Sequence, residues 1–242
     1  MLWAVGIVAV VALLLGAHSI TGDDVALFCV VVASIILHEI SHGWVANLCG
    51  DDTAKRAGRL SLNPLRHIDP VGTLILPALM VLSTGFLFGW AKPVPVDTRR
   101  LRSPRNQAVL VGLAGPATNL LLVAAAAIAF RYGLAHQLAL FRLGFSADVP
   151  FGWRLVYDAG YVNLVLGLYN LLPIPPLDGS ALVERLVPAS AWPGYLRVRR
   201  YLLPVTIGVM LLSLYIHVGG TTLLGRLSAD VESLWDRICG LG

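Results

Sequence analysis

The sequence predicts an all-α polytopic membrane protein with about five to six transmembrane segments, one of them re-entrant. Of its 242 residues, 57% are hydrophobic and 13% are charged, whereas a soluble domain carries about 25% charged residues. Apolar runs near the length of about 20 residues that a spanning helix needs recur along the chain. We expect one integral membrane domain over 1–242, with a core at 25–180, an accessory span at 1–20, and an accessory span with an amphipathic tail at 202–242.

The apolar runs follow one another in chain order. No basic segment precedes residues 2–20, which favours a membrane span over a signal peptide. The tail places Leu227, Val231, Leu234 and Ile238 at helical spacing, which indicates an amphipathic interfacial helix, with a frayed polar terminus as the alternative. The other predicted spans are 25–48, 71–90, 107–130, 155–172 and 202–224.

Basic residues set the expected topology. Thirteen of the 18 Lys and Arg residues lie in the loops 50–70, 91–106 and 180–201 (four, five and four in turn). If 71–90 crossed the bilayer, the first two loops would face opposite sides, which the positive-inside rule disfavours. A segment that enters and returns at Pro77 places all three loops in the cytoplasm and 131–154 outside. We therefore expect a multi-pass protein of the cell membrane.

The pattern His38-Glu39-Ile40-Ser41-His42 lies inside an apolar run. On a helix, positions i and i+4 share a face, so His38 and His42 can bind one metal ion. Glu39 lies one residue further round, where its carboxylate can act as a general base on an attacking water molecule. This arrangement is typical of zinc hydrolases. The alternative, two polar residues on a helix surface, is disfavoured because ionisable groups in membrane spans are costly and usually functional.

A catalytic zinc site needs a third protein ligand. In the expected topology Asp178 shares the depth of the two histidines, because it follows a span whose helix is broken by the prolines of 173–179. His67 lies in a loop on the same side, nearer the surface, where it could gate the site or support its ligands. The full set of candidates is His18, His67, His136, His217, Asp158 and Asp178.

The loops contribute further expectations. Arg59-Leu60-Ser61-Leu62 alternates polar and apolar residues as a strand would, so we expect a small β-hairpin or sheet element near the site, with strand edges near 59–62 or 86–96. The formal charge of +4 fits cytoplasmic loops and gives no reason to expect nucleic-acid binding. The three cysteines lack CxxC spacing and receive no role.

Three segments resemble the signatures of the site-2 protease family of intramembrane zinc metalloproteases. They are His-Glu-Ile-Ser-His at 38–42, Gly-Pro-Ala-Thr-Asn at 115–119 and Asn-Leu-Leu-Pro-Ile-Pro-Pro-Leu-Asp-Gly at 170–179. Residues 58–64 and 67–73 resemble a linking segment of the small bacterial members. The resemblance runs from about residue 30 to 180, and three signatures in this order are highly specific.

The resemblance implies that His38, His42 and Asp178 bind one zinc ion per chain and that Glu39 is the base. Asn119 and Asn170 would line the cleft that holds the substrate backbone. The implied activity is regulated intramembrane proteolysis: an endopeptidase with its active site near the cytoplasmic side would cleave single-span membrane proteins in or near their transmembrane segments. Many relatives carry PDZ or CBS domains, for which this chain has no room, so the mode of substrate selection stays open.

Two other classes of protein are alternatives. A membrane metal-binding or transport protein without protease activity would also place His and Asp in spans, but usually along a path and in repeated halves. This chain shows no internal repeat. An inactive scaffold would be expected to lose Glu39 or a ligand, and here the set is intact. The sequence defines neither the substrate nor the oligomeric state.

Overall fold

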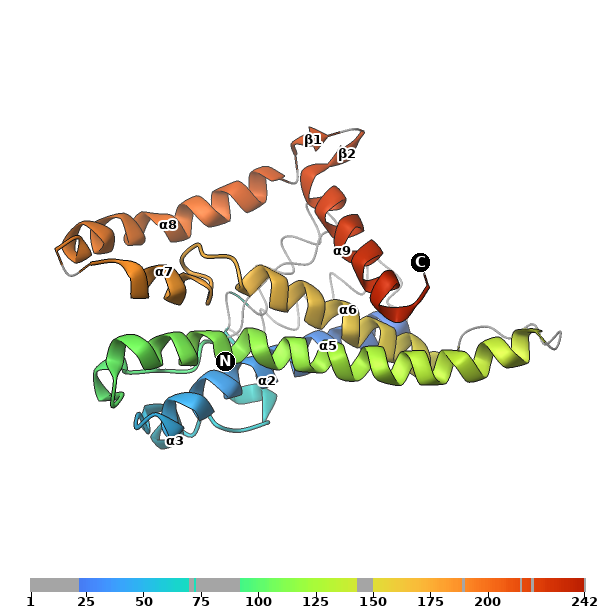
Figure 1. Ribbon diagram of the computed structural model, residues 1–242, viewed down its shortest axis with the longest axis horizontal. Helices are drawn as coiled ribbons and strands as arrows, with labels where there is room; N and C mark the ends of the chain where they lie inside the picture. The colour runs from blue at the N-terminus through green and yellow to red at the C-terminus, as the bar shows by residue number, and fades with distance from the viewer. Residues whose placement is uncertain are drawn as a thin grey trace, which may run out of the picture.

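The computed structural model describes a mostly helical chain (Figure 1). The described residues are 22–69, 72, 92–142, 150–188, 190–213, 215–218 and 220–241. The predicted accessory span at 1–20 and, apart from Gly72, the predicted re-entrant segment at 71–90 lie outside them. The elements are α2 (Gly22–Leu48), α3 (Thr53–Arg56), η1 (Pro64–Arg66), η3 (Thr98–Arg100), α5 (Pro104–Arg142), α6 (Phe151–Asn170), α7 (Ser180–Leu186), α8 (Trp192–Ser213), β1 (His217–Val218), β2 (Thr221–Thr222) and α9 (Leu223–Cys239).

Helices α2, α5 and α6 pack against one another and form the body of the structure (Figure 1). Within α2 and α5, the stretches Val25–Leu48 and Pro104–Gly133 are long and apolar enough to cross a membrane. They coincide with the predicted spans 25–48 and 107–130, whereas the total of five to six spans stays a prediction. Large apolar side chains on their outer faces are exposed, as expected for helices that face lipid.

Two of the predicted boundaries are wrong. Helix α5 continues to Arg142, so the predicted loop 131–154 is helical over its first half, because its Ala, Leu and Gln residues are good helix formers. The predicted span 202–224 is not one helix, since α8 ends at Ser213 and the hairpin of β1 and β2 follows. Gly220 in that hairpin adopts a φ of +89°, which glycine tolerates best.

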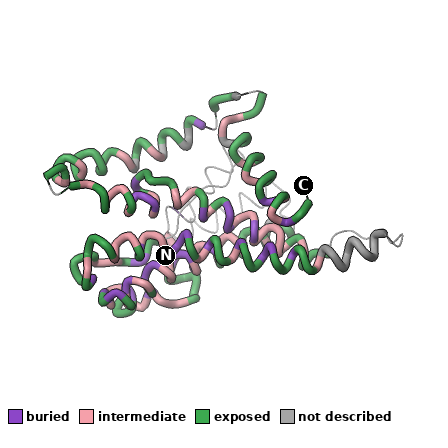
Figure 2. The backbone as a smooth tube through the Cα atoms, in the orientation of Figure 1, coloured by how far each residue is buried: buried purple, intermediate pink, exposed green. Residues whose placement is uncertain are grey.

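Helix α6 occupies most of the predicted span 155–172 and ends at Asn170, just before Pro173. Figure 2 shows buried positions along α2, α5 and α6, whereas α8 is mostly exposed. Helices α2, α5 and α6 thus form the buried centre of the structure, and α8 is more exposed than they are.

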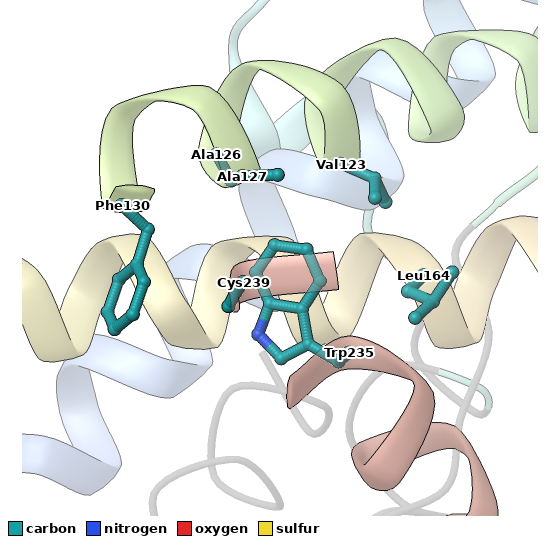
Figure 3. Packing of buried hydrophobic residues seen from close by; sticks show 7 residues of the cluster. All are labelled: Val123, Ala126, Ala127, Phe130, Leu164, Trp235 and Cys239. Atoms are coloured by element: carbon teal, nitrogen blue, oxygen red, sulfur yellow. The ribbon is translucent and has the colours of Figure 1, made fainter. Parts of the chain in front are cut away.

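The carboxyl-terminal tail forms α9, which packs on α5 and α6 (Figure 3). Its Trp235 is completely buried and its Cys239 is 2% exposed. Of the apolar residues that predicted an interfacial helix, Val231 and Ile238 pack against this core, whereas Leu227 and Leu234 are exposed. The tail is thus helical as expected, but its buried face covers other helices. The core cluster consists of Val123, Ala126, Ala127, Phe130, Leu164, Trp235 and Cys239.

The predicted β element at 59–62 is wrong. Those residues have no strand structure, and the strands among the described residues are the two-residue β1 and β2. The loop instead contacts the segment 92–97 through single hydrogen bonds. The N–H of Lys92 donates to the carbonyl of His67 over 2.9 Å, and the Arg59 guanidinium donates to the carbonyl of Lys92 over 2.6 Å. Polar side chains and carbonyls, and not a ladder, hold these two segments together.

Candidate metal centre

Two histidines and one carboxylate converge on one point. His38 and His42 project from one face of α2, and Asp178 lies in the loop between α6 and α7. The Nε2 atoms of His38 and His42 lie 3.0 Å and 3.3 Å from Oδ2 of Asp178, and 3.1 Å from each other. Within the described part of the chain, these three side chains form the group that could hold a metal ion.

The loop after α6 turns back sharply and carries Asp178 to the histidines. Prolines prevent the helix from continuing, and the N–H of Gly179 donates to the carbonyl of Asn170 over 2.7 Å. A Cβ at Gly179 would overlap the carbonyl of Leu171, so glycine is required for this close approach. Gly112 of α5 plays a similar part, because a Cβ there would lie 3.2 Å from the carbonyl oxygen of Asp178.

Both imidazoles are oriented through their Nδ1 atoms. His42 Nδ1 donates to the carbonyl of Val111 over 2.6 Å, and His38 Nδ1 donates to Oδ1 of Asn119 over 2.5 Å. With Nδ1 protonated, each neutral ring presents the lone pair of Nε2. Oδ2 of Asp178 is buried and has no hydrogen-bond partner. Three lone pairs with no proton between them repel one another, and a cation removes that repulsion. The donor set fits a catalytic zinc ion.

Gly115 makes room for this group. A Cβ at Gly115 would lie 2.5 Å from Nε2 of His38 and would also overlap Nε2 of His42. The α5 backbone therefore forms one wall of the site, and any larger residue at this position would occupy the space between the ligands. The Gly-Pro-Ala-Thr-Asn segment thus contributes twice, through Gly115 and through Asn119.

Glu39 is held by the extended segment 92–97. Its Oε2 accepts a hydrogen bond of 2.9 Å from the N–H of Val94. The Glu39 side chain is half-buried beside the histidines. This hydrogen bond fixes the carboxylate beside the two histidines.

The remaining predicted residues are each held by hydrogen bonds. Asn119 is completely buried, and its amide is used by His38 and Asn163. Asn170 donates to the carbonyl of Leu166 in its own helix over 3.0 Å. His67 is 2% exposed, and its Nε2 donates to the carbonyl of Ser61 over 2.8 Å. It does not join the group of His38, His42 and Asp178.

Sequence reasoning missed three contributors. Arg59 lies in the segment 58–64, whose resemblance to a linking segment gave its side chain no role. Val94 lies in a loop without a motif, and Asn163 lies seven positions before the third signature. A polar residue inside an apolar span is the one signal that could have identified Asn163. Asn163 lies opposite Asn119 because α5 packs on α6. The spacing of residues along the chain does not predict this contact.

The apolar helices and the His-His-Asp group beside a glutamate define a class of protein, the membrane zinc metalloproteases. A sequence model described as "Peptidase family M50" matches residues 134–213, which include Asp178. The chain belongs to this family, the site-2 protease family of zinc metalloproteases.

Curated relatives agree with the assignment. The chain is 44% identical over 164 residues to "Putative zinc metalloprotease YwhC" of Bacillus subtilis (strain 168), covering 65% of this chain and 67% of the relative. It is 32% identical to "Putative zinc metalloprotease Rip2" of Mycolicibacterium smegmatis, and the match covers 72% of this chain and 66% of that relative. For the protein of the same name in Mycobacterium tuberculosis the identity is 34%, covering 63% and 54%. The chain thus spans between half and two thirds of the length of these relatives. No solved structure matches it significantly.

Proposed function

We propose that the protein is an intramembrane zinc endopeptidase that hydrolyses peptide bonds in or near the transmembrane segments of membrane proteins, as in regulated intramembrane proteolysis. One observation carries the proposal. Two imidazole lone pairs, from His38 and His42, meet an unpartnered oxygen of Asp178 at one point. The carboxylate of Glu39, held by a backbone N–H, lies next to them. All of these residues belong to helices and loops of an apolar bundle.

Each residue has a proposed role. His38, His42 and Asp178 hold one zinc ion per chain, and Glu39 takes a proton from the attacking water and passes it to the leaving amine. When bound, zinc supplies Lewis-acid polarisation of the peptide carbonyl and lowers the pKa of the water. Asn119 keeps the His38 ring in place, which replaces the substrate contact expected from the sequence.

The substrate is a single-span membrane protein. A transmembrane helix uses its carbonyls in its own hydrogen bonds, so it must unwind locally before the attack. The extended segment 92–97 lies next to Glu39 through Val94, and an unwound substrate could lie along it as an added strand. Asn170, at the end of α6, is the proposed side-chain contact to that substrate, and it needs only to release its bond to Leu166.

The active site is proposed to lie near the cytoplasmic side of a multi-pass domain that includes residues 1–242. The hydrogen bond from Lys92 to the His67 carbonyl supports this topology, because it joins the two ends of the predicted re-entrant segment. Asp97 and Asp51 join the same loops again, with the N–H of Asp97 donating to Oδ2 of Asp51 over 2.6 Å. Both basic loops then face one side, as the positive-inside rule requires.

The test compares the full chain with Glu39→Gln, purified in detergent and mixed with a single-span membrane protein. The amide oxygen of glutamine still accepts from Val94, so the change removes the base with little disturbance. We expect cleavage to fall by about 10²–10⁴-fold, the usual contribution of a general base, with zinc content unchanged. Full cleavage by the variant would refute the proteolytic mechanism. Zinc binding by the wild type without any cleavage would favour a metal-binding protein.

A further inference from the structure

A chain of buried amide hydrogen bonds runs from α6 through α5 to the His38 ring. Asn163 of α6 is 2% exposed, and Asn119 of α5 is completely buried. The Nδ2 of Asn119 donates to Oδ1 of Asn163 over 2.7 Å, and Oδ1 of Asn119 accepts from His38 Nδ1. The Nδ2 of Asn163 donates to the carbonyl of Ala159 over 2.8 Å and to Oγ of Ser34 over 2.9 Å. The chain thus begins on α6 and ends at the proposed metal ligand.

The polarity of this chain is fixed at its far end. The carbonyl of Ala159 can only accept, so Asn163 must turn its NH₂ group toward it. Its Oδ1 then faces Asn119 and requires the NH₂ group of that residue. The Oδ1 of Asn119 is left for His38, so the Nδ1 of His38 must carry the proton. Nε2 is consequently unprotonated and aimed at Asp178 and His42.

If the direction of these hydrogen bonds were reversed, His38 would have the wrong tautomer for binding a metal ion. If Asn119 turned its NH₂ group toward His38, the imidazole would have to accept at Nδ1 and would carry its proton on Nε2. That proton would occupy the direction in which the ring offers a lone pair to the metal ion. Asn119 alone cannot prevent this reversal, since an amide can turn either end toward a neighbour. Asn163 removes the choice because its own orientation is set by a backbone carbonyl.

We propose that Asn163 is a positioning residue that, through Asn119, sets the tautomer of His38 and thereby the affinity of the site for zinc. The inference rests on the proposed function in one respect, that His38 is a zinc ligand. His42 needs no such relay, because its Nδ1 donates directly to the backbone carbonyl of Val111. The two histidines therefore depend on different parts of the fold for the same tautomer.

The experiment uses the full chain in detergent, labelled with ¹⁵N-histidine, in wild-type form and as Asn163→Leu. Zinc-free protein is studied by ¹⁵N NMR at a pH above which the His38 signals no longer change, and these signals are assigned with His38→Gln. Zinc affinity is measured by competition with a chromophoric chelator. In the wild type we expect one tautomer with the proton on Nδ1. In Asn163→Leu we expect a mixture of tautomers and an affinity lower by about tenfold, the lower end for groups that support a ligand.

Leu164→Ala is the matched control. Leu164 is a neighbour of Asn163 on α6 and is 3% exposed, but it makes only apolar contacts. This variant should lower thermal stability while leaving the His38 tautomer unchanged and zinc affinity within about twofold of the wild type, since no ligand support is removed. Asn163→Asp keeps an oxygen facing Asn119 and should retain the wild-type tautomer.

The outcomes separate the two proposals. A single Nδ1-protonated tautomer and wild-type affinity in Asn163→Leu would overturn the role of Asn163, as would an equal loss of affinity in Leu164→Ala. Asn163→Ala, which removes the same amide with less crowding, takes its place if the leucine variant does not fold. If the wild type bound no zinc, the proposed function would fail, while the tautomer comparison in zinc-free protein would still decide the role of Asn163.

Discussion

The backbone N–H of Val94 lies 2.9 Å from Oε2 of Glu39 and donates a hydrogen bond to it. This bond joins a loop to the carboxylate proposed to act as the base. Arg59 holds the loop in turn, with its guanidinium donating to the carbonyls of Lys92 and Pro93, and also to that of Arg66. Arg59 is 8% exposed, so its side chain is committed to these carbonyls. The position of Glu39 therefore depends on an arginine twenty residues away in the sequence.

Arg59→Lys should reduce catalysis without removing zinc. A lysine ammonium is a point charge, and it cannot donate to three carbonyls with the geometry of a planar guanidinium. We expect kcat for a single-span substrate to fall by about tenfold, because a small misplacement of a reacting group can cost up to about 10²-fold. Arg99→Lys is the control, since Arg99 is exposed and pairs with Asp97. A wild-type kcat in Arg59→Lys would show that Glu39 does not need the loop.

Asp178→Ala should lose zinc and activity together, whereas His67→Ala should keep its zinc. Oδ2 of Asp178 lies 3.0 Å from Nε2 of His38. His67 lies in a different loop from Asp178 and is hydrogen-bonded to the carbonyl of Ser61 in its own loop. Removal of one of three ligands weakens binding severely, and removal of a supporting group costs about 10–100-fold. Metal analysis after dialysis against a mild chelator distinguishes the two. An empty site in His67→Ala together with a full one in Asp178→Ala would reverse the ligand assignment.

The sequence predicted the helices and motifs that depend on local pattern. Apolar length located α2, the membrane-length part of α5, and α6, and the i, i+4 spacing placed His38 and His42 on one face. Local pattern failed where the outcome depends on tertiary contacts. Arg59–Leu62 alternates like a strand. However, the Arg59 side chain donates to the carbonyls of Lys92 and Pro93, which would otherwise be available for pairing with a strand.

The tail and the amide chain illustrate the same limit. Trp235 and Cys239 are spaced like the apolar residues that predicted an interfacial helix, but only the packing of α9 on α5 and α6 selects the buried face. The resemblance of residues 115–119 to a family signature implied that Asn119 contacts the substrate. Its burial between Asn163 and His38 follows from the approach of α5 to α6, which leaves no trace in the spacing of residues along the chain.

Single-cysteine labelling tests the topology. In a background without Cys29, Cys49 and Cys239, cysteines at Ser61 and Ser103 should both react only from the cytoplasm, because their loops are hydrogen-bonded to each other and carry basic residues. A cysteine at Asp23 should react only from outside. Labelling of Ser61 and Ser103 from opposite sides would show that 71–90 crosses the membrane.

Trp235→Ala should loosen α9. The indole is completely buried against α5 and α6, and Gly160 allows its close approach, since a Cβ there would overlap the ring. Truncation of a buried tryptophan costs about 3–5 kcal/mol of unfolding free energy. Burial, together with the Asp236 carboxylate, raises the pKa of the Cys239 thiol to about 11. With Cys239 as the single cysteine, its alkylation at neutral pH should therefore be slow and become faster in Trp235→Ala. An unchanged rate would show that α9 is held by other contacts.

Gly115→Ala should empty the metal site although it adds only one methyl group. The added Cβ would lie 2.5 Å from Nε2 of His38 and would overlap Nε2 of His42. The rings cannot retreat, because their Nδ1 atoms are bonded to Asn119 and Val111. We expect zinc content after mild chelation, and with it proteolysis, to fall at least about tenfold, as for other changes that displace ligands.

Gly167→Ala provides the control for the same chemical change in a neighbouring helix. A Cβ at Gly167 would meet the Cβ of Asn119 at 3.4 Å, an ordinary van der Waals contact. Alanine also favours a helix interior by about 0.5–1 kcal/mol over glycine. This variant should keep its zinc and its activity and unfold no earlier than the wild type. If Gly115→Ala retained zinc as well as Gly167→Ala does, the α5 backbone would not form a wall of the site, and the His38–His42–Asp178 group would have to bind its metal ion on another side.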